Sequence, residues 1–423
     1  MNVLVIGSGG REHAICHAFS KSPKVENLYC APGNAGIAQV AECVVIKHDE
    51  IERLADLAAE KDIDLTFVGG ETSLALGVVD EFESRGLRIV GPSRIASQLE
   101  SSKAFAKDFM ARQGVPTAEY FTADNIASAI AELESGRFGD AGSPVVVKAD
   151  GLAAGKGVVV ATDRAEAIAA INDMADLVGA DAAETIVLEE CLFGKEVSLI
   201  MFADGEDFAL MPPTRDHKRI GEGDTGPNTG GMGTITDESL LSPQELDEIV
   251  KTVIRPSLNG CVAEGFPFRG ILFLGLMMTA AGPKLLEYNV RFGDPETQAI
   301  LVRLETDLVD ICAAMLDGTL GDLDIKWRQG SSACVVLASE GYPAKPRTGD
   351  AISGLDTVSG IPYVTVFHAG TAASDDGDLL TSGGRVLGVT ATGDDVANAL
   401  NTAYSAVEKI SWPGMQFRRD IGK

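Results

Sequence analysis

Hydrophobic and polar positions alternate regularly through the first hundred residues. Short apolar runs predict buried strands over residues 2–6, 27–30, 43–46, 65–68 and 87–90. Stretches with helical spacing lie between them and predict helices over residues 11–20 and 51–60. Strands that alternate with helices are typical of a parallel sheet covered on both faces. The pattern therefore predicts a doubly wound α/β unit that ends near Gly91-Pro92.

The pattern changes after about Ser101, where strand pairs become more frequent than strand–helix alternation. It predicts helices over residues 103–113, 243–258 and 394–409, and strands over 145–148, 186–192, 271–279, 284–290, 333–338, 363–367 and 385–390. Residues 215–233 are poor in apolar side chains and rich in glycine, which predicts a loop. Loops of this length usually have a function.

Composition narrows the classes of partner. The chain has 423 residues and a net charge of −27, from 62 acidic and 35 basic side chains. A surface this acidic argues against nonspecific binding of nucleic acid or anionic membranes, although cations that converge locally can still bind small anions. A salt-rich host is the alternative source of the acidity, and activity that peaks at low salt would count against it.

Cysteine usage and apolar length bear on location. The seven cysteines are scattered and have no CxxC spacing, which favours free thiols in a reducing compartment. The longest apolar stretch, near residues 270–282, is too short to span a bilayer. We therefore expect a cytoplasmic protein.

A glycine turn, Gly7-Ser8-Gly9-Gly10, follows the first predicted strand and opens a helix. Glycines at this position let backbone N–H groups approach an anion. The third glycine of the dinucleotide fingerprint is replaced by Glu12, and the second strand ends without an acid that would hold a ribose. We therefore expect a sugar phosphate here. A tight turn without a ligand is the alternative, and His13 is expected to cap or pack.

A second glycine-rich loop lies between two valine-rich strands. Its spacing differs from that of a Walker A loop, so a hairpin that folds over phosphates is predicted, with Lys148 as a point charge. A flexible hairpin with solvated lysines is the alternative. The next strand ends at Glu189-Glu190, where an edge backbone beside Leu192 could bind adenine and Glu196 could bind ribose. Solvated acids at a strand end are nearly as plausible.

Two further stretches predict ligand chemistry. Glu287, Asn289 and Arg291 share one face of a predicted strand because side chains alternate. A carboxylate and an amide oxygen suit Mg²⁺, and Arg291 can clamp a carboxylate or phosphate. Residues 215–219 (RDHKR) place three cations near one carboxylate, which suits anion recognition, although His217 alone would more often be a packing residue.

The segments that carry these features resemble the phosphoribosylamine–glycine ligases of the ATP-grasp superfamily over nearly the whole chain. The matching segments are VLVIGSGGREHA, APGNAG, VGGE, LESSKAFAKDFM, VVVKADGLAAGKGVVVA, LEECLFGKE, RDHKR, GPNTGGMG, EYNVRFGDPETQ, LASEGYP, FHAGT, SGGRVLGV and RRDIG. The chain departs from the family at Gly70 and Ser73, where prolines are usual, and at Arg215, where Gln is usual. These departures affect loop rigidity and one local contact.

The resemblance implies an α/β ATP-grasp fold with a doubly wound parallel-sheet domain and a C-terminal mixed β domain. The expected division is a Rossmann-like sugar-phosphate domain at 1–101, an ATP-grasp domain at 102–325 with a nucleotide lid at about 120–192, and a C-terminal domain at 326–423. It also implies site residues. For the nucleotide these are Lys103, Lys148, Gly155, Lys156, Gly157, Glu189, Leu192 and Glu196. For the metal they are Glu287 and Asn289, and for catalysis Lys148, Arg291 and Asp294. For phosphoribosylamine and glycine they are Gly9, Gly10, Gly33, Asn34, Glu71, Asp216, His217, Lys218, Asn228 and Arg291.

The implied reaction is an ATP-dependent ligation of glycine to 5-phosphoribosylamine, with Mg²⁺ or Mn²⁺, by a monomer that acts on small molecules. Another ATP-grasp carboxylate–amine ligase of purine metabolism is the nearest alternative. An NAD-dependent oxidoreductase and a nonenzymatic nucleotide sensor are the alternatives from other classes.

Overall fold

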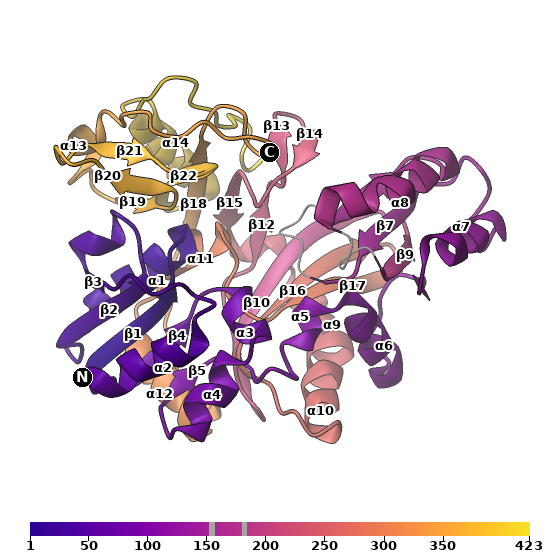
Figure 1. The fold of residues 1–423 in the computed structure, drawn as a ribbon, viewed down its shortest axis with the longest axis horizontal. Coiled ribbons are helices and arrows are strands. Elements are labelled where there is room, and N and C mark those ends of the chain that lie inside the picture. Colours follow the sequence, from indigo (N-terminus) through magenta and orange to yellow (C-terminus); the bar gives the residue numbers. More distant parts are fainter. Residues whose placement is uncertain (152–156, 180–183) are drawn as a thin grey trace.

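The first hundred residues form a parallel five-stranded sheet of order β3-β2-β1-β4-β5. The computed structural model describes residues 1–151, 157–179 and 184–423. Val3 and Val5 of β1 (Asn2–Gly7) pack on the face covered by α1 (Gly10–Ser20), whereas Leu4 and Ile6 pack on the face covered by α2 (Ile51–Glu60). The prediction of a doubly wound sheet is confirmed (Figure 1).

Two strands of this sheet are shorter than predicted. β3 covers only Glu42–Cys43, because the chain turns at Val44, where the Ile46 N–H donates to the Val44 carbonyl and Val45 points outward. β5 covers only Ile89–Val90, because the Leu87 N–H bonds to the end of α4 (Val78–Ser84). The remaining elements of this unit are β2 (Asn27–Pro32), β4 (Leu65–Val68), α3 (Glu71–Ala75) and α5 (Gln98–Ser101).

A nine-stranded sheet forms the centre of the molecule, with the order β17-β16-β10-β12-β15-β18-β22-β19 and β11 beside β10. Its strands are β10 (Lys195–Asp204), β11 (Phe208–Leu210), β12 (Thr214–Asp216), β15 (Gly233–Thr236), β16 (Arg269–Thr279), β17 (Gly282–Asn289), β18 (Ser331–Ala338), β19 (Val364–His368) and β22 (Arg385–Gly393). The sheet continues across the predicted boundary at 325–326. Strands of the last hundred residues therefore extend the central sheet (Figure 1).

A separate four-stranded sheet, β6-β9-β7-β8, lies to the right in Figure 1 with α7 (Ile126–Glu134) and α8 (Arg164–Val178). Its strands are β6 (Tyr120–Ala123), β7 (Val145–Ala149), β8 (Val158–Ala161) and β9 (Ile186–Glu190). β7 and β8 are antiparallel, with Lys148 opposite Val158. The predicted hairpin is confirmed.

The predicted 215–233 loop contains a hairpin of its own. β13 (Arg219–Gly221) pairs with β14 (Thr225–Asn228), and the two form a two-stranded sheet. The prediction of an irregular loop was wrong here because the hairpin lacks the apolar alternation of a buried strand. Polar contacts hold it in place instead.

The helix predicted at 243–258 is divided into α9 (Pro243–Ile249), a π-helical turn (Val250–Ile254) and α10 (Arg255–Ala263). Pro256 lacks the N–H that a continuous α-helix would use, which accounts for the widened turn before it. The other helices are α6 (Lys103–Gln113), α11 (Glu296–Leu301), α12 (Leu308–Asp317), α13 (Leu355–Val358) and α14 (Val396–Val407), and a last hairpin joins β20 (Thr371–Ala373) to β21 (Leu379–Thr381). Among the described residues, no helix combines the length and apolarity needed to cross a membrane.

Candidate active site

Two lysines share one buried carboxylate where α6 meets the β6–β9 sheet. The Lys107 Nζ lies 2.8 Å from one oxygen of Glu189, and the Lys148 Nζ lies 2.7 Å from the other. All three side chains are at most 7% exposed. Burial lowers the pKa of Lys107 to about 8, although Glu189 counteracts it. We call Lys107, Lys148 and Glu189 the lysine cluster.

This pairing changes the expected role of Glu189. Its carboxylate is engaged by two lysines, and its strand, β9, has β6 on one side and β7 on the other. A contact of Glu189 with adenine stays a prediction, and any such contact would require an exchange of partners. Leu192 lies beyond the end of β9, and Glu196 lies on β10, opposite Met277 of β16; both side chains are half-buried.

The base of the glycine loop is tied to the start of α6. The Lys103 Nζ donates to the Gly151 carbonyl at 2.9 Å. The Asp150 carboxylate accepts from the Ser102 hydroxyl at 3.1 Å and from the Ala104 N–H at 3.2 Å. These contacts hold Lys103 in place. Burial lowers the pKa of Lys103, and the nearby charge of Lys148 also lowers it.

The tip of that loop is only partly covered by the structure. Gly155 and Lys156 lie outside the described residues, so their predicted contacts with the nucleotide stay predictions. Gly157 is buried, and its carbonyl accepts from the Ala149 N–H at 2.8 Å, which closes the hairpin.

Glu287 and Asn289 lie on β17 opposite β16, and they are the oxygen donors predicted for a metal ion. Burial would raise the pKa of Glu287, but Lys218, Lys148 and Lys103 lower it, so the carboxylate stays ionised. An anionic carboxylate beside an amide oxygen fits Mg²⁺ or Mn²⁺. No group of three or more His, Cys, Asp or Glu that could hold a metal occurs among the described residues. The remaining ligands would have to come from water or phosphate.

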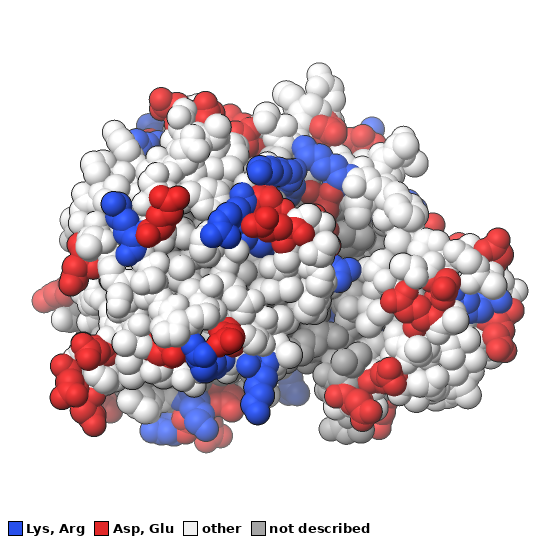
Figure 2. Space-filling model, turned by 90° about the horizontal axis from the view of Figure 1, so that it is seen from above, with Lys and Arg blue, Asp and Glu red and all other residues white. Residues whose placement is uncertain are grey.

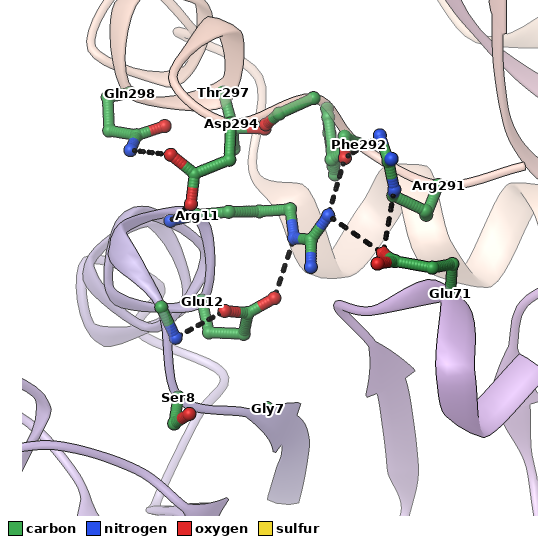
Figure 3. Close-up of polar contacts among 12 residues, drawn as sticks. Gly7, Ser8, Arg11, Glu12, Glu71, Arg291, Phe292, Asp294, Thr297 and Gln298 are labelled. Carbon is green, nitrogen blue, oxygen red and sulfur yellow. Dashed lines mark hydrogen bonds and ion pairs between the residues drawn. The ribbon is translucent and has the colours of Figure 1, made fainter. Parts of the chain in front are cut away.

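Arg291 extends this face and is held between two acids. Its Nε lies 3.1 Å from Glu71, and its Nη2 lies 2.7 Å from Glu100 (Figure 3 shows the Glu71 contact). Burial would raise the pKa of Glu71, but Arg291 and Arg11 lower it to about 2. Burial dominates at Glu100 and raises its pKa to about 7. We call Arg291, Glu71 and Glu100 the arginine cluster.

Glu12, which breaks the dinucleotide fingerprint, folds back onto the glycine turn. Its carboxylate accepts from the Gly9 N–H at 2.5 Å and from the Arg11 Nε at 2.6 Å (Figure 3). A Cβ added at Gly7 or Gly69 would lie within about 2.5 Å of the Glu12 side chain. Glu12 therefore fills the space between these glycines, which agrees with the prediction that no dinucleotide binds.

Asp294 lies beside the start of α1. Its carboxylate accepts from the Arg11 N–H at 3.2 Å and from the Gln298 Nε2 at 2.9 Å (Figure 3). Arg385, from β22, donates to the Asp294 carbonyl and to the Gly230 carbonyl, both at 2.5 Å. Three distant parts of the chain thus converge on Asp294.

The predicted sugar-phosphate residues are brought together at the glycine turn. A Cβ at Gly10 would meet Gln298 at 2.6 Å, and Gly33 has a φ of +73° above Cys43. The Asn34 amide donates to the Ser8 and His368 carbonyls, both at 2.8 Å, and its oxygen accepts from two backbone N–H groups. Asn34 therefore supports the turn from inside, which the sequence did not predict.

His13 is a packing residue, as expected. Its ring lies edge-on to Phe367 and its Nδ1 accepts from the His368 N–H at 2.8 Å.

The 216–218 stretch lies near Glu287 and Glu296. Burial and the nearby Glu296 raise the pKa of Asp216, whereas Lys218 is paired with Glu196. The His217 Nδ1 lies 3.1 Å from the Gly233 carbonyl, and its Nε2 accepts from the Gly422 N–H at 3.0 Å. Both ring nitrogens have partners within the protein, so a substrate contact by the ring would require an exchange of partners and stays a prediction.

Asn228 ends β14, opposite Arg219. Its predicted contact with substrate is untested and stays a prediction.

The sequence analysis missed Lys107, Glu100, Arg11 and Arg385. Lys107 lies one helical turn after Lys103 on the same face of α6, and that spacing could have revealed it. No local pattern marks Glu100, because the group it holds, the Val290 N–H, is 190 residues away.

Family models for phosphoribosylglycinamide synthetase match almost the whole chain: the N domain at residues 1–100, the ATP-grasp (A) domain at 101–297 and the C domain at 332–423. The chain belongs to the phosphoribosylglycinamide synthetase family. The resemblance found in the sequence is thereby confirmed.

Individual relatives agree with this family. The phosphoribosylamine–glycine ligase of Vibrio parahaemolyticus is 49% identical, over 100% of this chain and 98% of that protein. The ligase of Xanthomonas campestris pv. campestris is 48% identical, over 100% and 97%.

Solved structures agree as well. The crystal structure of the Thermotoga maritima phosphoribosylamine–glycine ligase has a TM-score of 0.85 at 32% identity and full coverage of both chains. The biotin carboxylase domain of Hydrogenobacter thermophilus 2-oxoglutarate carboxylase has a TM-score of 0.72 at 17% identity, over 98% of this chain and 91% of that one. The latter similarity concerns the fold, and it confirms the predicted ATP-grasp architecture.

Proposed function

We propose that this member of the phosphoribosylglycinamide synthetase family joins glycine to 5-phosphoribosylamine with ATP, giving glycinamide ribonucleotide, ADP and phosphate. The observation that carries the proposal is the face formed by Glu287, Asn289 and Arg291 opposite Lys103 and Lys148. It supplies oxygen donors for a cation and positive charge for phosphates, and the family models match almost the whole of the chain.

The first step is attack of the glycine carboxylate on the γ-phosphorus of ATP, which breaks the bond to ADP and forms glycyl phosphate. Lys103 and Lys148 offset the charge that develops on the phosphates, and Arg291 offsets charge on the acyl phosphate. Glu287 and Asn289 would hold Mg²⁺ or Mn²⁺, which neutralises phosphate charge when bound. Burial of Lys148 makes its charge more effective, because little water screens it.

The second step is attack of the phosphoribosylamine nitrogen on the acyl carbon, with release of phosphate. Gly9 and Gly10 lie at the start of α1, and a sugar phosphate bound there would replace Glu12 as the partner of the Gly9 N–H. Glu71 and Asp294 both lie near Arg11: Glu71 faces its guanidinium, and Asp294 accepts from its backbone N–H (Figure 3). This arrangement supports a binding mode in which phosphoribosylamine extends from the glycine turn toward an acyl phosphate near Arg291.

In this proposal the chain is divided into units at 1–101, 102–325 and 326–423, and residues 120–192, within the second unit, serve as a nucleotide lid. Their four-stranded sheet makes no strand pairing with the central sheet among the described residues. Closure of such a unit excludes water, which would otherwise hydrolyse an acyl phosphate. The charged side chains visible on the lobe at the right of Figure 2 are mostly acidic, whereas Lys148, which this proposal assigns to the phosphates, is buried.

The test is ADP release from Mg-ATP and freshly made phosphoribosylamine, with and without glycine. Glycine-dependent ADP with an equal amount of glycinamide ribonucleotide is the expected result. ADP that depends on another carboxylate would keep the ATP-grasp chemistry and replace the substrate. A Lys148→Met variant, assayed in parallel, controls for contaminating ATPase.

A further inference from the structure

Residues 418–422 (RRDIG) pack against the β13–β14 hairpin, which lies about two hundred residues earlier in the chain. The Arg418 side chain is 2% exposed, and its Nη1 lies 2.7 Å from the Asp224 carboxylate and 3.1 Å from the Arg219 carbonyl. Asp224 lies in the turn between the two strands, and Arg219 opens the first. One guanidinium therefore bonds both to the turn and to a strand of the hairpin.

Asp420 also bonds the segment to the hairpin. It accepts from Arg418 through two bonds of 2.8 Å, and it also accepts from the Gly223 N–H at 2.7 Å. Hydrogen bonds from Arg418 contribute most to lowering the pKa of Asp420 to about 2, so the carboxylate is ionised throughout the physiological range. The Arg419 N–H adds a bond of 3.2 Å to Glu222.

The same segment is anchored in the core on its other side. Ile421 is 1% exposed and packs in a cluster with Ile235, Ala333 and Ala399. Gly422 follows, and its N–H donates to the His217 Nε2 at 3.0 Å. The segment that contacts the hairpin is thus itself anchored in the core through Ile421 and Gly422.

His217 links this segment to the active site. Its Nδ1 lies 3.1 Å from the Gly233 carbonyl, so the ring is held from two directions. Asp216 and Lys218 are its chain neighbours. A Cβ added at Gly231 would meet both the Asp216 carboxylate, at 2.8 Å, and Pro295, next to Asp294, at 2.6 Å, and Lys218 is paired with Glu196. Because β13 and β14 pair only with each other among the described residues, nothing in the sheets fixes their position.

We infer that segment 418–422 positions Asp216 and Lys218 for glycine, acting through His217 and through the hairpin. The residues of segment 418–422 are positioning residues, because they act on the site through His217 and the hairpin. The inference rests on the proposed function in naming glycine as the ligand. The hairpin's dependence on the segment can be measured without any activity.

The experiment compares Arg418→Lys and Asp224→Asn with a matched control, Asp376→Asn, in the exposed turn between β20 and β21. Lysine keeps the charge of Arg418 but loses the two-pronged bond to Asp420. Asparagine keeps the shape of Asp224 and tolerates its φ of +54°. Backbone hydrogen exchange of residues 219–228 and trypsin cleavage after Arg219 report on the hairpin, and thermal unfolding reports on the whole fold.

We expect exchange in the hairpin to be about tenfold faster in Arg418→Lys, which corresponds to about 1.4 kcal/mol, and about threefold faster in Asp224→Asn. The KM for glycine should rise by about the same factors in each, and the KM for phosphoribosylamine and the control should not change. Unchanged exchange would overturn the inference, and so would faster exchange with an unchanged KM for glycine. If the unmodified chain makes no glycine-dependent ADP, the proposed function fails. The glycine assignment fails with it, and the exchange data then decide only whether the segment holds the hairpin.

Discussion

The lysine cluster and the arginine cluster are both buried, but they carry opposite surpluses of charge. In the first, Lys107 and Lys148 share the single carboxylate of Glu189. In the second, one guanidinium, Arg291, lies between Glu71 and Glu100. The surplus lysine can attract phosphate, whereas the surplus acid binds a proton more readily, as the raised pKa of Glu100 indicates.

The two clusters also differ in how many partners each cation, Lys148 or Arg291, already has within the protein. Among the residues that the structure describes, Lys148 contacts Glu189 and, at a longer distance of 3.5 Å, the Leu286 carbonyl. Arg291 donates to Glu71, Glu100, Asn289 and the Phe292 carbonyl. Lys148 can therefore accept a phosphate with little rearrangement, but Arg291 must give up a partner before it can clamp one.

Glu287 lies between the clusters, and its replacement should have the largest effect. In Glu287→Gln the side chain keeps its size but loses the charge that Lys103, Lys148, Lys218 and Arg291 sustain. We expect kcat to fall by more than about a hundredfold, because an amide oxygen binds Mg²⁺ more weakly than the charged carboxylate it replaces. Turnover should be measured across a range of Mg²⁺ and Mn²⁺ concentrations. Normal turnover at ordinary Mg²⁺ would contradict the metal assignment.

The two lysines of the lysine cluster should differ in importance. Lys148→Met removes the cation with spare capacity, so we expect a loss of about a hundredfold in kcat/KM for ATP. Lys107→Met removes the lysine that also donates to Thr117, and we expect a loss of about tenfold, transmitted through Glu189. Equal losses in the two variants would mean that the cluster acts as a unit and that the comparison above is wrong.

Arg291→Lys tests whether the fork of donors matters or only the charge. Lysine cannot bridge Glu71 and Glu100 as a guanidinium does, so we expect kcat/KM for glycine to fall about thirtyfold. Arg53→Lys, on the exposed face of α2, is the matched control. A variant with full activity would show that the charge alone is sufficient.

Local signals in the sequence were enough to predict the first part of the site. Helix 103–113 is bounded as predicted, because Ser102 caps its start and Gly114 adopts the left-handed conformation at its end. Alternation along the predicted strand placed Asn289 and Arg291 on one face. β17 ends at Asn289, but the bond of 3.2 Å between the two side chains confirms that they lie together. In both cases the deciding contacts lie within a few residues of each other.

Contacts between distant residues could not be predicted in this way. Glu189 ends an apolar strand and has the appearance of a solvent-exposed acid, but two lysines from other elements neutralise it. The bond between Gly422 and His217 joins residues 205 apart, and no period in the sequence records it. Buried charges of this kind depend on how the units pack, which the pattern of a single segment does not contain.

Glu100→Gln should have the smallest effect and the most specific one. Burial raises the pKa of Glu100 from an ordinary 4.5 to about 7 in the folded protein. Between pH 4.5 and pH 7 the folded state binds a proton at Glu100 that the unfolded state has released. The free energy of unfolding therefore falls as the pH rises through this range. Glutamine has no such proton, and its amide oxygen can still accept from the Val290 N–H.

The stability of Glu100→Gln relative to the unmodified chain should therefore increase between pH 5 and pH 8, by at most about 3 kcal/mol. For a chain of this size the change in Tm should be a few degrees, measurable by thermal unfolding at both pH values. Glu52→Gln, on the exposed face of α2, should give a nearly constant difference. Parallel curves for Glu100→Gln and the unmodified chain would mean that Arg291 keeps Glu100 ionised. The arginine cluster would then hold two full negative charges. It would differ from the lysine cluster in the sign of its surplus charge but not in its tendency to bind a proton.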